Sequence, residues 1–272
     1  MERAEPGPLR RIGRIAASLA VGYGLLVVLM AMLETVLVYP RPHVERARLD
    51  GLAAELGAEV VEPVAADGTS LYGWRFGHHE RMVVCFSGNG GTVGAWVDRY
   101  RRFEAAGFSV LHVNYRGYPG SSGSPTEEGL IEDAHAVWGL ATQTHAPEDI
   151  VLLGKSLGGG VAVALAADVR PRLLVVESSF TSAVDVGAEA YPFLPVRLLM
   201  RNRWHSLERA PQVRSPALVL HGREDAMIGP WHGEALAGEL PEAALILVDG
   251  AGHNDDLLAD AVAWQSFLDR AL

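Results

Sequence analysis

Short apolar runs, separated by helix-forming stretches, recur along most of this 272-residue chain and constrain its fold more than any other feature. The runs are rich in leucine and β-branched residues and comprise residues 82–86, 109–115, 150–153, 173–177, 217–220 and 244–248. Runs of this length without a polar face are typical of strands buried on both sides in a parallel sheet. Their alternation with helices predicts a mostly parallel sheet that helices cover on both faces.

The segments between and before these runs complete the expected α/β domain, which we place at residues 41–272. Helices are expected at residues 95–106, 126–141, 158–167, 230–240 and 255–272. Residues 59–63 and 71–76 are expected to form a hairpin around the turn signal Asp67-Gly68. The one long irregular insert, residues 178–215, is expected to lie over the strand ends as a small cap.

A run of nineteen residues without a charge, residues 15–33, precedes this domain. As a helix it would rise about 28 Å, close to the hydrocarbon thickness of a bilayer. Glu34 is followed by a further apolar stretch, so we predict a transmembrane anchor over residues 15–39 behind an N-terminal tail of residues 1–14. A buried core helix would show a polar face, which this run does not have.

A cleaved signal peptide is the alternative interpretation of the same run. Arg10, Arg11 and Arg14 form a basic region in front of it, as in a signal peptide. However, the run is longer than the usual apolar region of a signal, and no clear small-x-small cleavage site follows it. These features favour an uncleaved anchor.

The arginines that flank the run predict its orientation. Those before it are Arg3, Arg10, Arg11 and Arg14, and those after it are Arg41, Arg46 and Arg48. Positive charge is retained on the cytoplasmic side of a membrane helix. The small excess on the N-terminal side therefore favours a globular domain on the extracytoplasmic side.

Charge and cysteine content exclude some classes of function. The formal net charge is -10 and no basic stripe offsets it, so nucleic acid is not an expected partner. The single cysteine, Cys85, lies within an apolar run, where we expect a small buried side chain. One cysteine allows neither a disulfide within these residues nor a cysteine-rich metal site.

The segment Gly154-Lys155-Ser156-Leu157-Gly158 fits the pattern G-x-S-x-G, which places a serine on a tight turn between a strand and a helix. An apolar run leads into it and a helix-forming run leads out of it, which is the setting that the pattern requires. We therefore expect Ser156 to be a nucleophile. A glycine-rich turn without chemistry is the alternative.

A nucleophilic serine requires a base, and a histidine base requires an acid that orients it. His253 lies in a glycine-rich loop directly after the last apolar run, and Asp225 follows the run before it. Both positions are at the carboxyl ends of strands, where ligands bind in open α/β sheets. Glu224 and Glu177 are the alternative acids. Of the other histidines, His112 and His221 are expected to pack inside the fold and His232 to lie on the surface.

Attack by the serine would create an oxyanion, which requires two N–H donors. We expect one from the backbone of Leu157, directly after the serine. The other is expected from the backbone of Asn89 in the glycine-rich loop 86–91.

Further segments in the same order strengthen this interpretation. They are residues 114–125 (NYRGYPGSSGSP), 177–181 (ESSFT) and 191–195 (YPFLP). Together with the segments around Ser156, Asp225 and His253, they resemble the α/β-hydrolase superfamily, in particular its membrane-anchored, serine aminopeptidase-like branch. The resemblance runs from about Val61 to the C-terminus. It implies an α/β-hydrolase fold and hydrolysis of ester, thioester or amide bonds without a metal or an organic cofactor.

Two positions depart from the pattern of that family. Ser87 stands where histidine is usual, and Asn114 stands where aspartate is usual. The first affects the loop that carries Asn89, and the second affects the support of the loop after Asn114.

We therefore expect a membrane-tethered serine esterase or thioesterase that acts on small acyl or lipid-like substrates. A serine peptidase or amidase is the alternative among enzymes, and a non-catalytic tethered binding protein is the alternative outside them.

Overall fold

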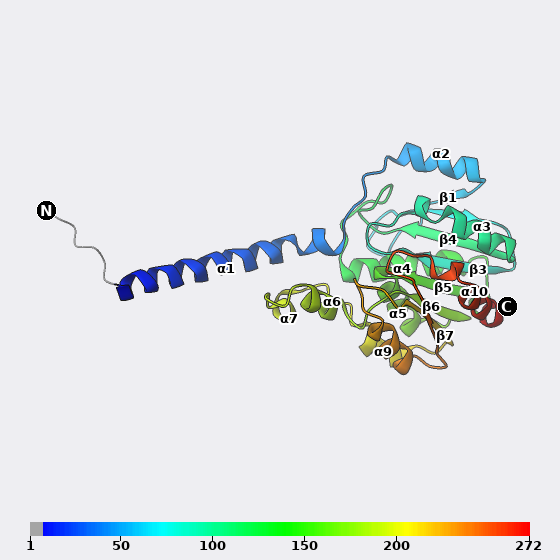
Figure 1. Cartoon of the computed structure of the whole chain (residues 1–272). Helices are drawn as coiled ribbons and strands as arrows, with labels where there is room; N and C mark the ends of the chain where they lie inside the picture. Colours follow the sequence, from blue (N-terminus) through cyan, green and yellow to red (C-terminus); the bar gives the residue numbers. More distant parts are fainter. Residues whose placement is uncertain (1–7) are drawn as a thin grey trace.

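Eight strands form one sheet in the order β1-β2-β4-β3-β5-β6-β7-β8 (Figure 1). Their bounds are β1 Glu59–Val61, β2 Tyr72–Phe76, β3 Arg81–Phe86, β4 Phe108–Asn114, β5 Ile150–Lys155, β6 Leu173–Glu177, β7 Ala217–Gly222 and β8 Ala244–Val248. The computed structural model describes residues 8–272. Strands β1 and β2 form the predicted hairpin, β2 runs antiparallel to β4, and the remaining neighbours are parallel. The mostly parallel sheet predicted from the apolar runs is confirmed.

Two apolar cores lie on opposite faces of the sheet. Along β5, Ile150 and Leu152 belong to one core, whereas Val151 and Leu153 belong to the other, as the alternation of side chains along a strand requires. Helices α4 (Glu127–Ala141), α5 (Leu157–Asp168) and α9 (Trp231–Glu239) pack on the first face. Helices α2 (Arg46–Leu56), α3 (Val97–Ala105) and α10 (Ala261–Ala271) pack on the second.

The elements differ from the expectation at three places. Helix α2 was not expected, because its sequence buries only Leu49 and Ala53 and shows little apolar periodicity. The last helix begins at Ala261 and not at residue 255, because residues before it form a loop and a 3-10 turn. Helix α1 (Pro8–Val38) begins inside the segment that we expected to be a tail, and residues 1–7 of that tail lie outside the described residues.

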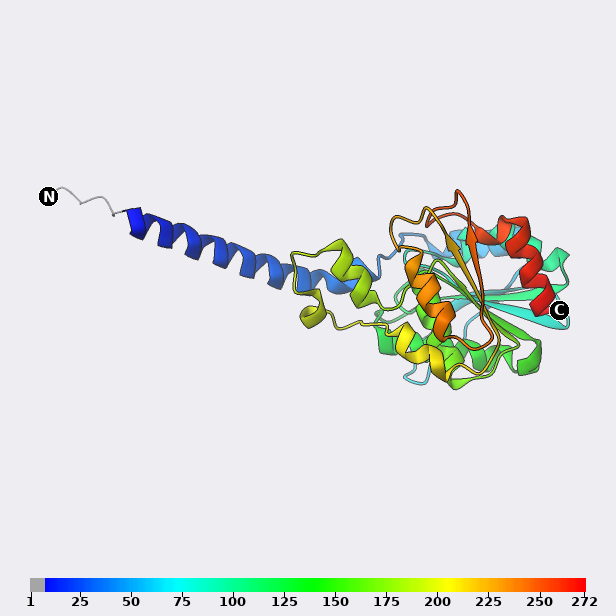
Figure 2. The same ribbon diagram turned by 60° about the horizontal axis from the view of Figure 1, so that its bottom comes forward.

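The cap comprises three short helices, α6 (Ala183–Ala190), α7 (Val196–Leu199) and α8 (Ser206–Arg209). Both ribbon views show α6 and α7 beside the C-terminal part of α1, where this helix meets the globular domain (Figures 1 and 2). The cap therefore contacts α1 as well as the sheet.

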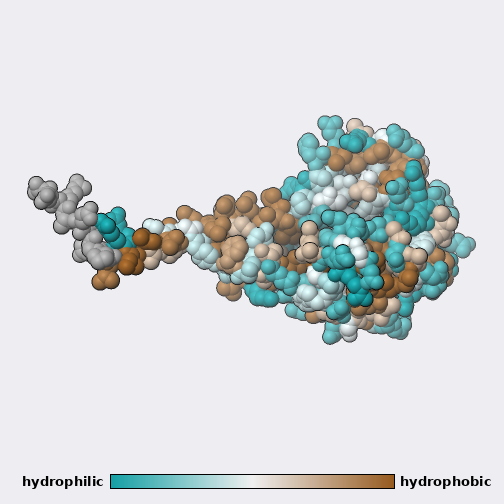
Figure 3. Space-filling model, in the orientation of Figure 1, coloured by the Kyte–Doolittle hydropathy of each residue, from teal (hydrophilic) through white to brown (hydrophobic). Residues whose placement is uncertain are grey.

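Helix α1 projects from the domain and is long and apolar enough to cross a membrane. Its segment Arg11–Val38 has a mean hydropathy of 2.2 over its most apolar window, and none of that window is buried inside the protein. The space-filling view shows a largely apolar surface along α1 and a mostly hydrophilic surface on the globular domain (Figure 3). This exposure excludes a core helix and fits either a membrane anchor or a signal sequence.

Candidate active site

Ser156 lies on the turn between β5 and α5, in a strained backbone conformation. Its φ is 53° and its ψ is -118°, values that side-chain-bearing residues adopt rarely and at a cost of about 1–3 kcal/mol. The neighbouring glycines make the turn possible. A Cβ at Gly154 would lie 2.1 Å from the carbonyl oxygen of Gly158, and a Cβ at Gly158 would lie 2.0 Å from the carbonyl oxygen of Phe86.

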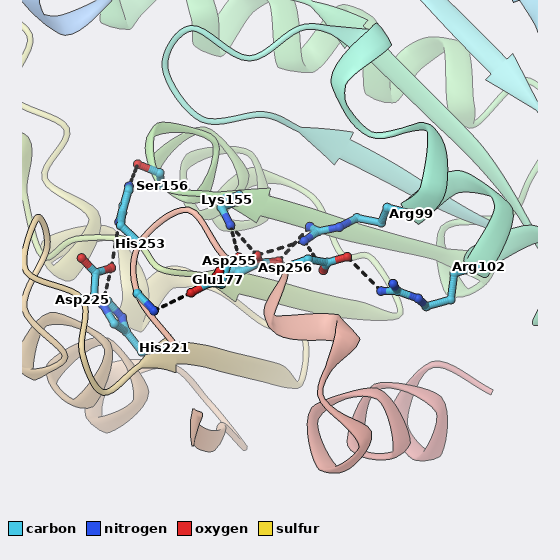
Figure 4. Close-up of polar contacts among 11 residues, drawn as sticks. Arg99, Arg102, Lys155, Ser156, Glu177, His221, Asp225, His253, Asp255 and Asp256 are labelled. Atoms are coloured by element: carbon cyan, nitrogen blue, oxygen red, sulfur yellow. Dashed lines mark hydrogen bonds and ion pairs between the residues drawn. The ribbon is translucent and has the colours of Figure 1, made fainter. Parts of the chain in front are cut away.

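Three side chains from separate loops form a hydrogen-bonded series. Nε2 of His253 lies 3.0 Å from Oγ of Ser156, and Nδ1 of His253 lies 2.7 Å from Oδ2 of Asp225. Figure 4 shows the three side chains in line, each from a loop at the carboxyl end of β5, β7 or β8. The structure thus brings together the serine, acid and histidine that the sequence singled out.

The environment of Asp225 keeps its carboxylate ionised. Oδ1 accepts backbone N–H groups of Met227 and Ile228 at 3.0 and 2.8 Å. Burial raises the pKa of Asp225, but hydrogen bonds from His221, His253 and the N–H of Ile228 outweigh it and hold that pKa well below its usual range. An ionised Asp225 accepts the Nδ1–H of His253, which leaves Nε2 without a proton and able to accept one from the serine.

The alternative acids have different positions. Glu224 is exposed, with its backbone N–H bonded to the carbonyl of Ala251. Glu177 is fully buried and accepts from Nη1 of Arg99 at 2.8 Å and from Nζ of Lys155 at 2.9 Å. Burial raises the pKa of Glu177, but the charges of Arg99 and Lys155 outweigh it and lower that pKa to about 2. Glu177 is therefore the centre of an ion cluster and not the partner of His253.

This ion cluster also holds the loop that follows His253. Arg99 pairs with Asp256, Arg102 pairs with Asp256 at 2.9 Å, and Lys155 donates to the carbonyl of Asp255 at 2.5 Å (Figure 4). Sequence reasoning did not find these contacts, because Arg99 lies far from the motifs along the chain. The one available signal was Lys155, the single lysine of the chain, directly before the serine.

The backbones of Leu157 and Asn89 lie beside the serine. Both residues line the same cavity as Ser156. Leu157 is the first residue of α5, so its N–H has no acceptor within the helix. Gly88 brings the second loop close, since a Cβ there would lie 3.3 Å from the Cβ of Ser156. The first turn of α5 and the loop that carries Asn89 therefore both lie at Ser156.

Asn114, which stands where the family usually has aspartate, supports the loop after β4. Its Oδ1 accepts the N–H of Val93 at 2.9 Å, and its Nδ2 donates to the carbonyl of Pro119 at 2.9 Å. One amide thus connects the loop that carries Asn89 to the loop after β4. At the other departure, the carbonyl of Ser87 accepts the hydroxyl of Tyr115 at 2.7 Å. Both loops therefore have side-chain support.

An apolar cavity of about 260 Å³ opens at Ser156. Four groups line it: the last turns of α1, the loop of Asn89, the cap, and Met227 with Ile228. The lining is apolar except at Glu34, Asn89, Ser156 and Tyr191. The cap residues that line it include Phe180, Tyr191, Leu194, Leu199 and Met200, whereas Phe193 and Leu198 are exposed on the surface.

Three further histidines and the cysteine are buried in the fold. His112, His221 and Cys85 are buried in strands, as expected. His232 is also fully buried, so the expectation of a surface position was wrong. The segment after β6 packs against α9 at this position. There the hydroxyl of Thr181 lies 2.8 Å from Nδ1 of His232.

The sheet order, the serine on a strained strand-to-helix turn and the loops at the strand ends together define an α/β-hydrolase. The chain belongs to this superfamily, within the serine aminopeptidase S33 family. The model of the family described as serine aminopeptidase, S33, matches residues 77–202, and the model described as TAP-like protein matches residues 200–266.

Similar proteins come from distant organisms. An uncharacterized protein of Mycobacterium tuberculosis is 39% identical over 71% of this chain and 72% of its own length. Human alpha/beta hydrolase domain-containing protein 17B is 34% identical over 54% of this chain and 51% of its own length. Among solved structures, the Pyrococcus furiosus esterase Pf2001 has a TM-score of 0.65 at 20% identity and covers 84% of this chain and 95% of its own. An acetyl xylan esterase from Paenibacillus has a TM-score of 0.64 at 17% identity, covering 88% and 99%. At these identities the structures show the fold alone.

Proposed function

We propose that the protein is a membrane-anchored serine hydrolase that cleaves ester or thioester bonds of acyl substrates. The observation that carries the proposal is the series Ser156–His253–Asp225, with its serine at the mouth of an apolar cavity. A solvent-filled polar cleft would suit a different substrate. An apolar cavity with few polar groups is typical of a site for a small apolar ligand.

The reaction follows from this geometry. Oγ of Ser156 attacks the substrate carbonyl as Nε2 of His253 accepts the hydroxyl proton, and Asp225 stabilises the resulting imidazolium. The N–H groups of Asn89 and Leu157 stabilise the oxyanion. The bond to the leaving oxygen or sulfur then breaks, and His253 returns the proton to the leaving group. Water attacks the acyl-enzyme by the same route, which releases the acid and restores the serine hydroxyl.

The lining of the cavity argues for esters and against an aminopeptidase. An aminopeptidase needs a carboxylate that can hold the substrate ammonium. Among the lining residues that the structure describes, Glu34 is the one carboxylate, and the segment at Arg201 and Asn202 already occupies it. In the cap, Asp185 is bonded to Ser182 and paired with Arg197.

Contacts of α1 with the cap argue for a retained anchor. The carboxylate of Glu34 accepts the N–H groups of Arg201 and Asn202, both at 2.8 Å, and Nδ2 of Asn202 at 2.9 Å. Tyr39 is buried and accepts the indole N–H of Trp204 at 3.0 Å. Signal cleavage beyond the apolar run would remove Glu34 and leave the N–H of the buried Asn202 without its acceptor, at a cost of about 1–3 kcal/mol.

The test is fluorophosphonate labelling of the full-length protein in detergent or vesicles. We expect wild type to be labelled and Ser156→Ala to lose both labelling and turnover of p-nitrophenyl esters. Because the three residues act as a unit, Ser156→Ala with His253→Ala should be hardly slower than either single variant. Labelling at full strength in Ser156→Ala would overturn the assignment. A wild-type protein that neither labels nor hydrolyses esters would instead support the non-catalytic binding protein, and faster cleavage of aminoacyl nitroanilides than of esters would support a peptidase.

A further inference from the structure

We propose that α1 is a wall of the acyl site and that the acyl chain of a bilayer-resident ester enters this site from the membrane leaflet, between α1 and the cap. The inference rests on the proposed function and deepens it, because it makes the membrane helix a determinant of substrate choice and not only a tether.

The first observation is a stripe along α1. Partly or fully buried residues begin only in the second half of the helix, at Val27, Met30, Ala31, Glu34, Thr35 and Val38. Their spacing of three and four residues places them on one face of the helix. Met30, Ala31, Glu34 and Val38 also line the cavity that contains Ser156. One face of the apolar helix therefore closes the site, while the other faces stay exposed.

The second observation is how far the cap extends along the helix. Glu34 is bonded to Arg201 and Asn202 at one end of the cap, and the hydroxyl of Tyr23 donates to the carbonyl of Phe193 at the other, at 2.8 Å. The rise from Tyr23 to Glu34 is about 16 Å in an α-helix. Tyr23 lies in the middle of the uncharged run 15–33. When α1 spans a bilayer, the tip of the cap lies at the depth of the acyl chains.

The tip of the cap has the side chains and the backbone that this depth requires. Phe193 is 60% exposed and Leu198 is 85% exposed, which is unfavourable in water and favourable in lipid. Non-helical backbone in a membrane must satisfy its polar groups internally. Here Pro192 and Pro195 have no backbone N–H. The backbone N–H groups of Leu194 and Val196 donate to carbonyls within the same segment at 3.0 and 2.8 Å.

Two arginines near the tip are paired. Arg197, the charged residue of α7, forms an ion pair with Asp185 at 2.9 Å. Arg201 pairs with Glu34 at 2.9 Å, at the end of the helix where the membrane surface would lie. Long arginine side chains at such a depth can extend towards the headgroups.

The occupant follows from the shape and chemistry of the cavity. It is almost entirely apolar, with a volume of about 260 Å³, and Ser156 and Asn89 lie among its few polar groups. A single acyl chain fits these properties, with its ester carbonyl at Ser156. A chain that already lies in the leaflet reaches the cavity without crossing water.

The experiment uses full-length protein in phosphatidylcholine vesicles with 4-methylumbelliferyl oleate, which partitions into the bilayer, and 4-methylumbelliferyl acetate, which is water-soluble. Ala31→Trp adds bulk to the cavity wall on α1, and Met32→Trp adds the same bulk at the next position, where the side chain is 75% exposed. We expect Ala31→Trp to lower the oleate-to-acetate ratio of kcat/KM at least tenfold, and Met32→Trp to leave this ratio unchanged.

Surface dilution of the wild type is the second measurement and does not depend on the folding of any variant. At a fixed total amount of oleate ester, added phosphatidylcholine should lower the rate in proportion to the falling mole fraction of ester in the bilayer. A rate that follows the total ester concentration, or an unchanged ratio in a folded Ala31→Trp, would overturn lateral entry. Fluorophosphonate labelling in the same vesicles separates the two proposals: labelling with failed lateral entry overturns only this inference, whereas absent labelling overturns the proposed function.

Discussion

At the scale of single residues, Asp225 and Glu177 show how surroundings divide the tasks of two buried carboxylates. Glu177 is the last residue of β6, and Asp225 follows the neighbouring parallel strand β7. Asp225 accepts backbone N–H groups on one oxygen and His253 on the other, whereas Glu177 accepts the cations Arg99 and Lys155. The sequence favoured Asp225 as the acid by its position and left Glu177 as an alternative, because the partner Arg99 that explains Glu177 lies 78 residues away.

Asp225→Asn should lower kcat by about four orders of magnitude, because an amide cannot keep His253 in the tautomer that accepts the serine proton. Glu224→Gln, one position earlier and exposed, is the matched control and should retain kcat within about twofold, as surface substitutions away from a site do. The measurement is kcat for a p-nitrophenyl ester. An unchanged kcat in Asp225→Asn would show that another acid orients His253.

Glu177→Gln should lower the free energy of unfolding. The substitution leaves Arg99 and Lys155 short of a buried counter-charge, and breaking such a pair costs about 3–5 kcal/mol of unfolding free energy. Denaturant titration of the full chain in detergent measures this loss. At temperatures where the variant is folded, its kcat should fall far less than that of Asp225→Asn. A normal stability with a kcat as low as that of Asp225→Asn would contradict this role.

At the scale of elements, the contact between α1 and the cap joins the membrane segment to the site. Glu34 is the one charged residue between Ile15 and Tyr39, and the structure shows why a carboxylate is tolerated there: four donors from residues 201 and 202 satisfy it. The sequence presented Glu34 only as an interruption of an apolar run.

Glu34→Ala should loosen the cap. Loss of the carboxylate removes the acceptor of the N–H groups of Arg201 and Asn202, and for the buried Asn202 this costs about 1–3 kcal/mol. We expect cleavage by trypsin at the arginines of residues 197–203 to become at least tenfold faster, while the sheet stays resistant. Met32→Ala, on the exposed face of the same turn, is the control. Equal protection of the cap in both variants would show that Glu34 does not hold it.

At the scale of the whole molecule, the length and exposure of α1 predict how the protein behaves in cells. Alkaline carbonate should leave the protein in the membrane pellet, because the uncharged run 15–33 of α1 is held by the hydrocarbon and not by charge. The N-terminus of the purified protein should retain α1. A mature N-terminus near residue 40, or release into the supernatant, would support a cleaved signal sequence instead.

Acid should destabilise the fold because the buried side chain of His112 stays unprotonated. Burial, together with the charge of Arg99, lowers the pKa of His112 from 6.5 to about 3. Between these values the unfolded chain binds a proton that the folded chain does not, so stability falls as the pH falls. From pH 7 to pH 5 the loss should be on the order of 1–2 kcal/mol, measured by denaturant titration. His112→Asn, which cannot titrate but keeps an amide near Tyr100, should reduce this slope, and an equal slope would contradict the assignment.

The sequence by itself determined the class of fold and the residues of the candidate site. Apolar runs mark strands because burial on both faces excludes polar side chains, and G-x-S-x-G marks a turn that only glycine neighbours permit. Positions after the runs marked His253 and Asp225, since parallel strands end at one edge of the sheet. Local chemistry was sufficient for each of these.

Only the tertiary structure decided which groups meet across long sequence distances. It paired Arg99 with Glu177, covered His232 with Thr181, and placed α1 against the cap so that Ala31 and Glu34 line the cavity of Ser156. These contacts depend on how helices and loops pack on the sheet, and packing leaves no periodic mark in a single sequence when one element supplies only one or two buried side chains. For the same reason α2, which buries only Leu49 and Ala53, became visible only in the folded molecule.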